Sequence, residues 1–148
     1  MRRVDREVAS DEAMRFLAEA ADGVLSMVGT DGAPYAVPVN HAVVDGCIVI
    51  HCARQGQKID NLRADARVCY TVYRATEIDF EELTTRYMSA CAFGRAELVE
   101  DVAVKRQLLE RMTEHLAPGA AFTCNDEQVA RTGLIRIWID SVTGKANR

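Results

Sequence analysis

The sequence lacks any long apolar run. No hydrophobic segment approaches the roughly 20 residues that cross a bilayer, and the first residues lack the apolar core of a signal peptide. It also lacks an excess of basic residues, since the formal net charge is −4. Such a chain has no general electrostatic attraction to nucleic acid. We therefore expect a cytoplasmic protein with neither a membrane nor a nucleic-acid partner.

The common signatures of protein-borne catalysis are missing as well. The sequence contains no G-x-S-x-G elbow, no Walker loop and no H-E-x-x-H pair. Its densest group of carboxylates, between Glu77 and Glu82, lies in a polar segment and is typical of a solvated loop. No nucleophile stands out, so a cofactor would have to supply any reactivity.

Cysteine usage excludes a disulfide framework. The five cysteines are odd in number and show no C-x-x-C spacing, which is typical of a reduced chain. A zinc site could still be drawn from His41, Cys47, His51 and Cys52. However, Cys47 and Cys52 would lie at opposite ends of one strand and on opposite faces of it. We therefore expect no metal.

The length of 148 residues and the hydrophobic fraction of 49% indicate one soluble domain over residues 1–148. Helices are expected at 11–21 with Ser10 as the cap, at 57–64, at 102–116 with Asp101 as the cap, and at 126–131. Between them lie apolar runs of strand length bounded by turn residues.

Those runs predict six antiparallel strands. A three-strand meander spans 24–52, with Pro38 marking an edge or bulge; the fourth strand covers 67–74 and the fifth 87–100, with a bulge at Gly94. The last covers 133–140. Segment 75–85 is expected to be an irregular loop and 141–148 a tail. Because closing a sheet removes its edges, the fold class is mainly β with α, a small antiparallel barrel with peripheral helices.

The segment from Val43 to Leu62 is the most informative part of the chain. After an Asp45-Gly46 turn, an apolar strand ends at His51 and Cys52, and a Gly-containing loop leads into a helix whose first turn carries Lys58. Free helix N–H groups beside a cation favour an anion, so a phosphorylated planar cofactor would fit. Each residue also has a simpler interpretation: a structural histidine, an ordinary turn glycine and a solvated lysine.

The two-residue turn also predicts a register. If Val44 pairs with Cys47, then Asn40 lies opposite His51 and Val39 opposite Cys52, which would form one wall of the site. Asn40 could instead satisfy backbone at a bulge. Ser89, on another strand, could contact a ring or be an ordinary strand hydroxyl.

The order of DREV, PYAVPVN, IHCARQGQKIDNL, RVCY, YMSACAFGRAELVED and WIDSVTGKA resembles the flavin-binding split-barrel family that includes pyridoxamine 5′-phosphate oxidase, and in particular its nitroimidazole-resistance branch. The resemblance implies a six-stranded split-barrel homodimer with FMN at the subunit interface. It places the ring against Val37–Asn40 and the strand end His51–Ala53, and the phosphate on Gln57 and Lys58. The implied cofactor-binding residues are Val37, Pro38, Val39, Asn40, His51, Cys52, Ala53, Gln57, Lys58, Ser89, Trp138 and Lys145.

The implied activity is that of an FMN-dependent oxidoreductase, in which NADH or NADPH reduces the flavin and a nitroaromatic or quinone accepts the electrons. His51 would border the ring as the catalytic residue. Two features depart from the oxidase itself: Gln57 replaces the arginine beside the phosphate lysine, and the substrate-phosphate arginine signature is absent. Vitamin B6 oxidation is therefore not expected. The alternatives are a flavin-binding protein without turnover and a haem protein with His51 or His41 as axial ligand.

Overall fold

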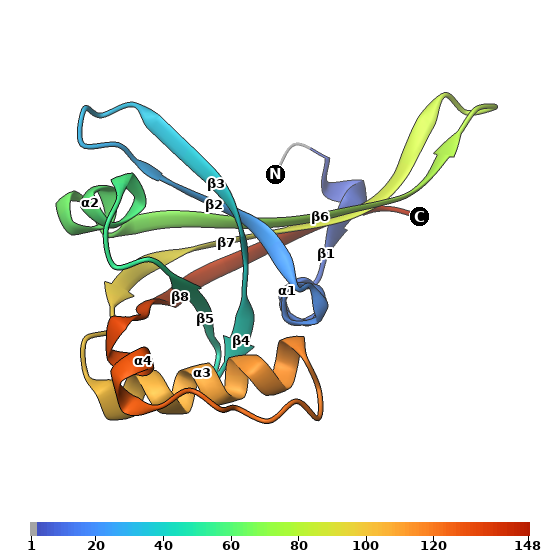
Figure 1. Cartoon of the computed structure of the whole chain (residues 1–148). Helices are drawn as coiled ribbons and strands as arrows, with labels where there is room; N and C mark the ends of the chain where they lie inside the picture. Colours follow the sequence, from blue (N-terminus) through green and yellow to red (C-terminus); the bar gives the residue numbers. More distant parts are fainter. Residues whose placement is uncertain (1–2) are drawn as a thin grey trace.

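The computed structural model describes residues 3–148 as one curled antiparallel sheet with helices around it (Figure 1). The strands are β1 (Glu7–Val8), β2 (Asp22–Val28), β3 (Pro34–Asn40), β4 (Ala42–Val44), β5 (Cys47–Cys52), β6 (Arg67–Asp79), β7 (Thr84–Leu98) and β8 (Gly133–Asn147). The helices are a 3₁₀ turn (Val4–Arg6), α1 (Ser10–Glu19), α2 (Gln57–Ala64), α3 (Val102–Leu116) and α4 (Asp126–Arg131).

The strand order shows how the sheet becomes a split barrel. The path runs β3-β2-β6-β7-β8-β5-β4, with β1 added to β8. Its two end strands, β3 and β4, are consecutive in the sequence and separated only by His41. The chain therefore joins the two edges of the curled sheet covalently. This confirms the expected split barrel.

His41 fixes this junction through two buried hydrogen bonds. Its Nε2 faces the carbonyl oxygen of Leu17 at 2.9 Å and must therefore donate. Nδ1 is left as the acceptor for the Tyr70 hydroxyl, also at 2.9 Å. Burial lowers the pKa of His41, which keeps the imidazole neutral.

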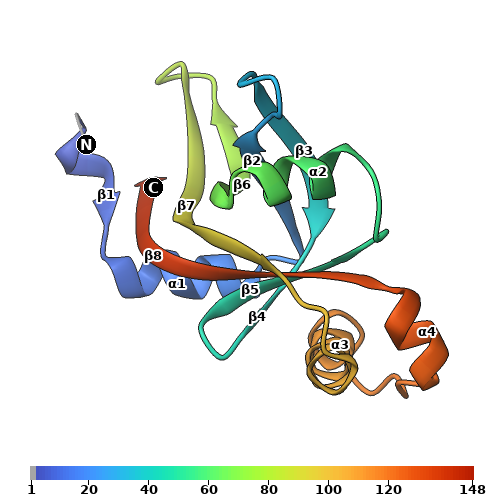
Figure 2. The ribbon, with the colours of Figure 1, turned by 90° about the vertical axis from the view of Figure 1, so that its left-hand side faces the viewer.

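Two hydrophobic clusters hold the fold. The larger fills the barrel and includes Leu25, Ile50 and Tyr70, with α1 and α2 packed against it. The smaller lies between α3 and the outer side of β4, β5 and β8, around Val49 and Leu108. Figure 2 shows α3 and α4 together on that side of the sheet. The strand end of β5 is thus set between the two clusters, next to α2.

Several expectations about the elements are confirmed. Val44 pairs with Cys47, and the predicted register holds as far as Ala42 opposite Val49. Helices α3 and α4 have the expected bounds, and the Asp101 side chain caps α3. The register of β7 against β8 shifts at Gly94, as expected for a bulge. Strand β3, which carries Pro38, pairs only with β2 and is an edge of the sheet path.

Other expectations were wrong. The run 34–44 is not one strand, because His41 divides it and Asn40 pairs with Asp22 of β2. Neither the predicted Asn40–His51 pair nor the Val39–Cys52 pair belongs to the ladder. Ser10 begins α1 as its first helical residue, and no side chain caps that helix. With β1 and the separate β4, the sheet has more than the six strands expected.

The segments expected to be irregular are also strand. Strands β6 and β7 continue through 75–85 as a hairpin arm that extends beyond the barrel on the side away from α2 (Figure 1). Ile78, Phe80 and Leu83 are exposed on the arm. Strand β8 continues to Asn147, so 141–147 pairs with β7 and is not a tail.

Candidate functional site

The N-terminus of α2 is open. It follows Gly56, whose φ of 121° and ψ of 170° lie in a region that essentially only glycine occupies. No side chain caps this helix end. The Gly56 carbonyl accepts from the N–H groups of Ile59 and Asp60, whereas those of Gln57 and Lys58 make no hydrogen bond with any residue of 3–148. Two donors at the positive end of a helix dipole are therefore left for an external acceptor.

The first turn adds a free cation to these donors. Lys58 is half-buried and forms no ion pair within residues 3–148, and Gln57 is exposed. A phosphate group matches this combination, because it accepts from backbone N–H groups and carries the opposite charge. The residues present thus fit a phosphorylated cofactor.

The end of β5 lies directly before this loop. His51 is exposed and Cys52 is half-buried, and they pair with Leu134 and Gly133 of β8. As neighbours on one strand they face opposite sides, with Cys52 packed against the barrel core. Burial raises the pKa of the Cys52 thiol, against smaller lowering effects of Lys58 and Lys105, so the thiol stays protonated.

The predicted site residues on β3 also alternate between the two faces of their strand. Val37 and Val39 are half-buried against the core, whereas Pro38 and Asn40 are exposed. Asn40 Nδ2 donates to the Ala21 carbonyl at 3.4 Å, which matches the alternative that Asn40 satisfies backbone. Strand β3 does approach β5 at the seam of the barrel.

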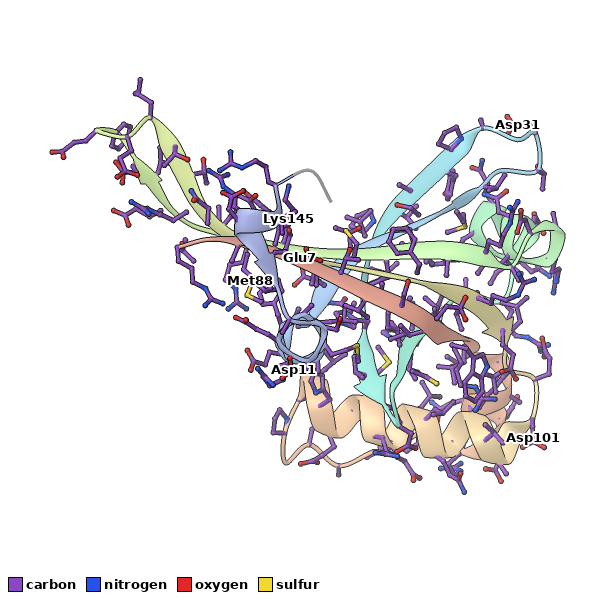
Figure 3. The ribbon with its side chains drawn as sticks, turned by 180° about the vertical axis from the view of Figure 1, so that it is seen from behind. Glu7, Asp11, Asp31, Met88, Asp101 and Lys145 are labelled. Carbon is purple, nitrogen blue, oxygen red and sulfur yellow. The ribbon has the colours of Figure 1, made fainter. Side chains whose placement is uncertain are left out.

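Ser89 and Lys145 lie elsewhere. They pair with each other on β7 and β8, and Figure 3 shows Lys145 near Met88, where β7 and β8 leave the barrel. Between Gly133, opposite Cys52, and Lys145 run roughly 40 Å of strand, at about 3.3 Å per residue. A single chain therefore does not bring Ser89 and Lys145 to Lys58.

Trp138 occupies a third position. Its Nε1 donates to Glu97 Oε2 at 2.8 Å, and the Arg136 guanidinium lies 4.6 Å from the ring centroid. These contacts fix the indole on β8 with about half of its surface exposed. The cluster that the structure forms from the predicted residues is thus His51–Ala53 with Gln57 and Lys58.

Sequence reasoning missed two buried polar residues beside this cluster. Lys105 on α3 is only 2% exposed and lines a pocket next to α2. Asn61 is fully buried; its Oδ1 accepts from the Thr30 N–H at 3.1 Å, and its Nδ2 has no partner in the described part of the chain. Neither stands out in the sequence, because a polar residue on a helix normally faces solvent.

Within residues 3–148, no three His, Cys, Asp or Glu side chains are gathered so that they could hold a metal ion. Helices long and apolar enough to cross a membrane are absent from the same residues.

Comparison with solved structures shows the same fold in several proteins. A candidate 5-nitroimidazole antibiotic resistance protein from Bacteroides thetaiotaomicron matches with a TM-score of 0.85 at 23% identity, over 94% of this chain and 85% of its own. An FAD and haem binding protein from Mycobacterium smegmatis matches with a TM-score of 0.84 at 23% identity, over 97% and 74%. An FAD-binding protein from Mesorhizobium loti matches with a TM-score of 0.72 at 25% identity, over 97% and 98%.

A search of curated proteins finds no match. The family model described as pyridoxamine 5′-phosphate oxidase matches residues 9–146, nearly the whole chain, and includes both the β5 strand end and α2. The chain therefore belongs to the pyridoxamine 5′-phosphate oxidase family of flavin-binding split barrels.

Proposed function

We propose that this protein is an FMN-dependent oxidoreductase that passes electrons from NADH or NADPH to a small acceptor such as a nitroaromatic or a quinone. The observation that carries the proposal is the open N-terminus of α2, with the N–H groups of Gln57 and Lys58 and the Lys58 ammonium beside the end of β5. Family membership and the likeness to flavin-binding proteins support it.

A bound flavin would supply hydride and electron transfer. The part of the chain is to hold and orient that group. Lys58 and the free N–H groups of α2 bind the phosphate, and the backbone of His51–Ala53 and Val37–Asn40 borders the ring. The exposed imidazole of His51 lies at that border.

The proposal includes a homodimer that completes the cofactor site. Ser89 and Lys145 lie on the outer face of the sheet together with the exposed Tyr73 and Phe93. Since one chain holds them far from Lys58, a second copy packed on this face would bring them to the cofactor. Sedimentation equilibrium should give a dimer, and Phe93→Glu should shift it to monomer. A monomeric wild-type protein would rule out this part of the proposal.

The direct test is an absorption spectrum of the untagged protein as purified, followed by titration of flavin-free protein with FMN and riboflavin. We expect flavin absorption, and a loss of FMN affinity of about 10- to 100-fold in Lys58→Gln with riboflavin affinity unchanged, because a charge-assisted hydrogen bond to phosphate is lost. Arg15→Gln, an exposed residue on α1, is the control. A colourless protein that takes up no FMN would exclude the proposal.

Anaerobic reduction separates turnover from simple flavin binding. NADH or NADPH should bleach the bound flavin, and a nitroaromatic or quinone should restore its colour. Flavin that neither donor bleaches would indicate a binding protein without turnover.

Haem binding is the second candidate. The likeness to an FAD and haem binding protein favours it, and the exposed His51 ring makes no hydrogen bond within residues 3–148. His41 does not suit an axial ligand, because both of its ring nitrogens are already hydrogen-bonded in the core. Haem reconstitution should give a Soret band that His51→Ala removes; without the band this candidate is excluded.

A further inference from the structure

A second cationic pocket lies beside α2, between that helix and α3. Arg54, Arg63, Glu100 and Lys105 provide its polar lining, and Ile59 and Leu134 are among its apolar residues. The pocket has room for about one water molecule. Its mouth adjoins an open depression over Ala53–Gln55, and Arg54 and Arg63 line both.

Lys105 is the unusual member of this pocket. Its side chain is 2% exposed, yet the ammonium makes no hydrogen bond with any residue of 3–148. The carboxylate nearest to it is that of Glu100, 3.9 Å away, which is 62% exposed and accepts from Arg54 at 3.1 Å. An ammonium has three donors, and Lys105 lines the pocket, so these donors are available to an acceptor there.

The cationic side chains around the pocket outnumber the carboxylates that pair with them. Arg63 has its carboxylate partner, Asp60, only at 3.9 Å. Arg54, Arg63 and Lys105 therefore share two carboxylates, and only the contact between Arg54 and Glu100 is within hydrogen-bond distance. Such an excess of cationic donors, with one of them buried, is suited to a multiply charged anion.

This pocket is close to the proposed flavin-phosphate position. Ile59, which lines the second pocket, directly follows Lys58 on α2. Lys58 does not line the second pocket, whereas Ile59 and Arg63 of the same helix do. Two anion positions thus adjoin the first turns of α2.

We propose that Arg54, Arg63 and Lys105 form a second phosphate subsite, which binds the diphosphate of an adenine dinucleotide. The inference rests on the proposed function, which puts the flavin phosphate at Lys58. Because the pocket is too small for a phosphate group, the group lies in the adjoining depression, which Arg54 and Arg63 also line. The dinucleotide is either the flavin cofactor itself, as FAD, or the nicotinamide donor.

Binding titrations on flavin-free protein, followed by flavin fluorescence, separate the two phosphate positions. If the dinucleotide is FAD, wild-type protein should bind FAD more tightly than FMN. Lys105→Met and Arg63→Gln should then weaken FAD binding about 10- to 100-fold and change FMN binding less than about threefold. Lys58→Gln should weaken both ligands and spare riboflavin. Arg15→Gln is the surface control, and circular dichroism verifies that Lys105→Met folds.

The nicotinamide source is tested on FMN-loaded protein by titration with NADPH and NADH under argon. If the dinucleotide is the nicotinamide donor, FAD and FMN should bind with similar affinity. Arg63→Gln should then weaken the binding of NADPH or NADH about tenfold and leave the affinity for FMN unchanged. If Arg63→Gln and Lys105→Met change none of these affinities while FMN still binds, the subsite is excluded and the proposed function stands. If no flavin binds, calorimetry with ADP decides: saturable binding that Arg63→Gln abolishes supports the subsite, and no heat excludes it.

Discussion

Helices α2 and α3 begin in opposite ways. The Asp101 carboxylate accepts from the Val104 N–H at 2.9 Å, so a side chain caps the start of α3. Helix α4 does the same through a reciprocal pair between Asn125 and Gln128. Helix α2 has only Gly56 in that place. Side chains therefore cap α3 and α4, whereas α1, behind Ala9, and α2, beside a strand end and a lysine, start without such a cap.

Capped and uncapped helix ends differ in what they contribute: a cap stabilises the fold, whereas an uncapped end is available for binding. A side-chain cap typically stabilises a helix by about 1 kcal/mol, and an open end forgoes that contribution. The uncapped N–H groups remain available to an anion, which benefits from the helix dipole as well. Figure 3 shows Asp101 on the α3 side of the molecule, well away from Lys145 near the arm.

Among the substitutions that test this comparison, Gly56→Ala should have the largest effect. An L-residue at φ 121° and ψ 170° is strained, so the substitution should lower the free energy of unfolding by about 1–3 kcal/mol. If the loop shifts to relieve the strain, FMN affinity should fall as well. Urea unfolding and flavin titration measure the two effects. Gly119→Ala, with φ 80° in the loop after α3, is the control that should lose stability alone. Unchanged stability in Gly56→Ala would contradict this backbone conformation.

His41 and His51 show a similar difference, because the imidazole of His41 is buried and hydrogen-bonded whereas that of His51 is exposed. Folded His41 has its pKa lowered mainly by burial, whereas unfolded histidine titrates near its ordinary pKa of about 6.5. Below that pH the unfolded state binds a proton that the folded state does not. The free energy of unfolding should therefore fall as pH drops below about 6.5, by at most about 1.4 kcal/mol per pH unit, and this contribution should be constant above about pH 7.5.

Urea unfolding between pH 5 and 8 measures this slope. His41→Gln should lower stability throughout and remove the histidine contribution to the slope. His51→Gln, on the exposed end of β5, should leave the slope in place. An unchanged slope in His41→Gln would show that other groups cause the pH dependence.

A smaller effect is expected from Asp101→Ala. Loss of the cap should lower the free energy of unfolding by about 1 kcal/mol, since Val104 N–H loses its acceptor. FMN affinity should stay the same, because the Asp101 carboxylate accepts from its own helix and does not line the second pocket. A change in FMN affinity in this variant would remove the distinction between the two helix ends.

Local signals in the sequence are sufficient for much of the fold. The Asp45-Gly46 turn fixes the pairing of β4 with β5, because a two-residue turn leaves one register. Asp101 and the apolar stripe of α3 predict the bounds of that helix. Similarly, Gly56 and Lys58 predict an anion position by their place in the sequence, since helix starts and their donors are local features.

The wrong predictions share a non-local cause. The predicted register fails beyond Ala42, because the closure of the barrel bends the chain at His41, which bonds to Leu17 and Tyr70 from distant elements. The carboxylates in 75–85 conceal the strand alternation of an arm that is exposed on both faces. The burial of Lys105 depends on the packing of α3 against the sheet, which no local pattern specifies.

The smallest effect, and the sharpest test of the second pocket, is expected from Glu100→Gln. Its carboxylate is 62% exposed, so its ion pair with Arg54 should contribute less than about 0.5 kcal/mol to stability. The same carboxylate competes with any phosphate for Arg54 and Lys105. Its removal should therefore tighten binding of the dinucleotide by about two- to fivefold and leave FMN unchanged.

Glu114→Gln, a neutralisation on an exposed part of α3, controls for the change in net charge. If both variants tighten dinucleotide binding equally, the effect comes from the overall charge of the protein, which salt screens over a Debye length of about 8 Å at physiological ionic strength. If only Glu100→Gln does so, and the gain persists in about 0.5 M salt, the anion lies against this carboxylate. The open end of α2 then adjoins a second site, to which the first turn of α3 contributes Lys105.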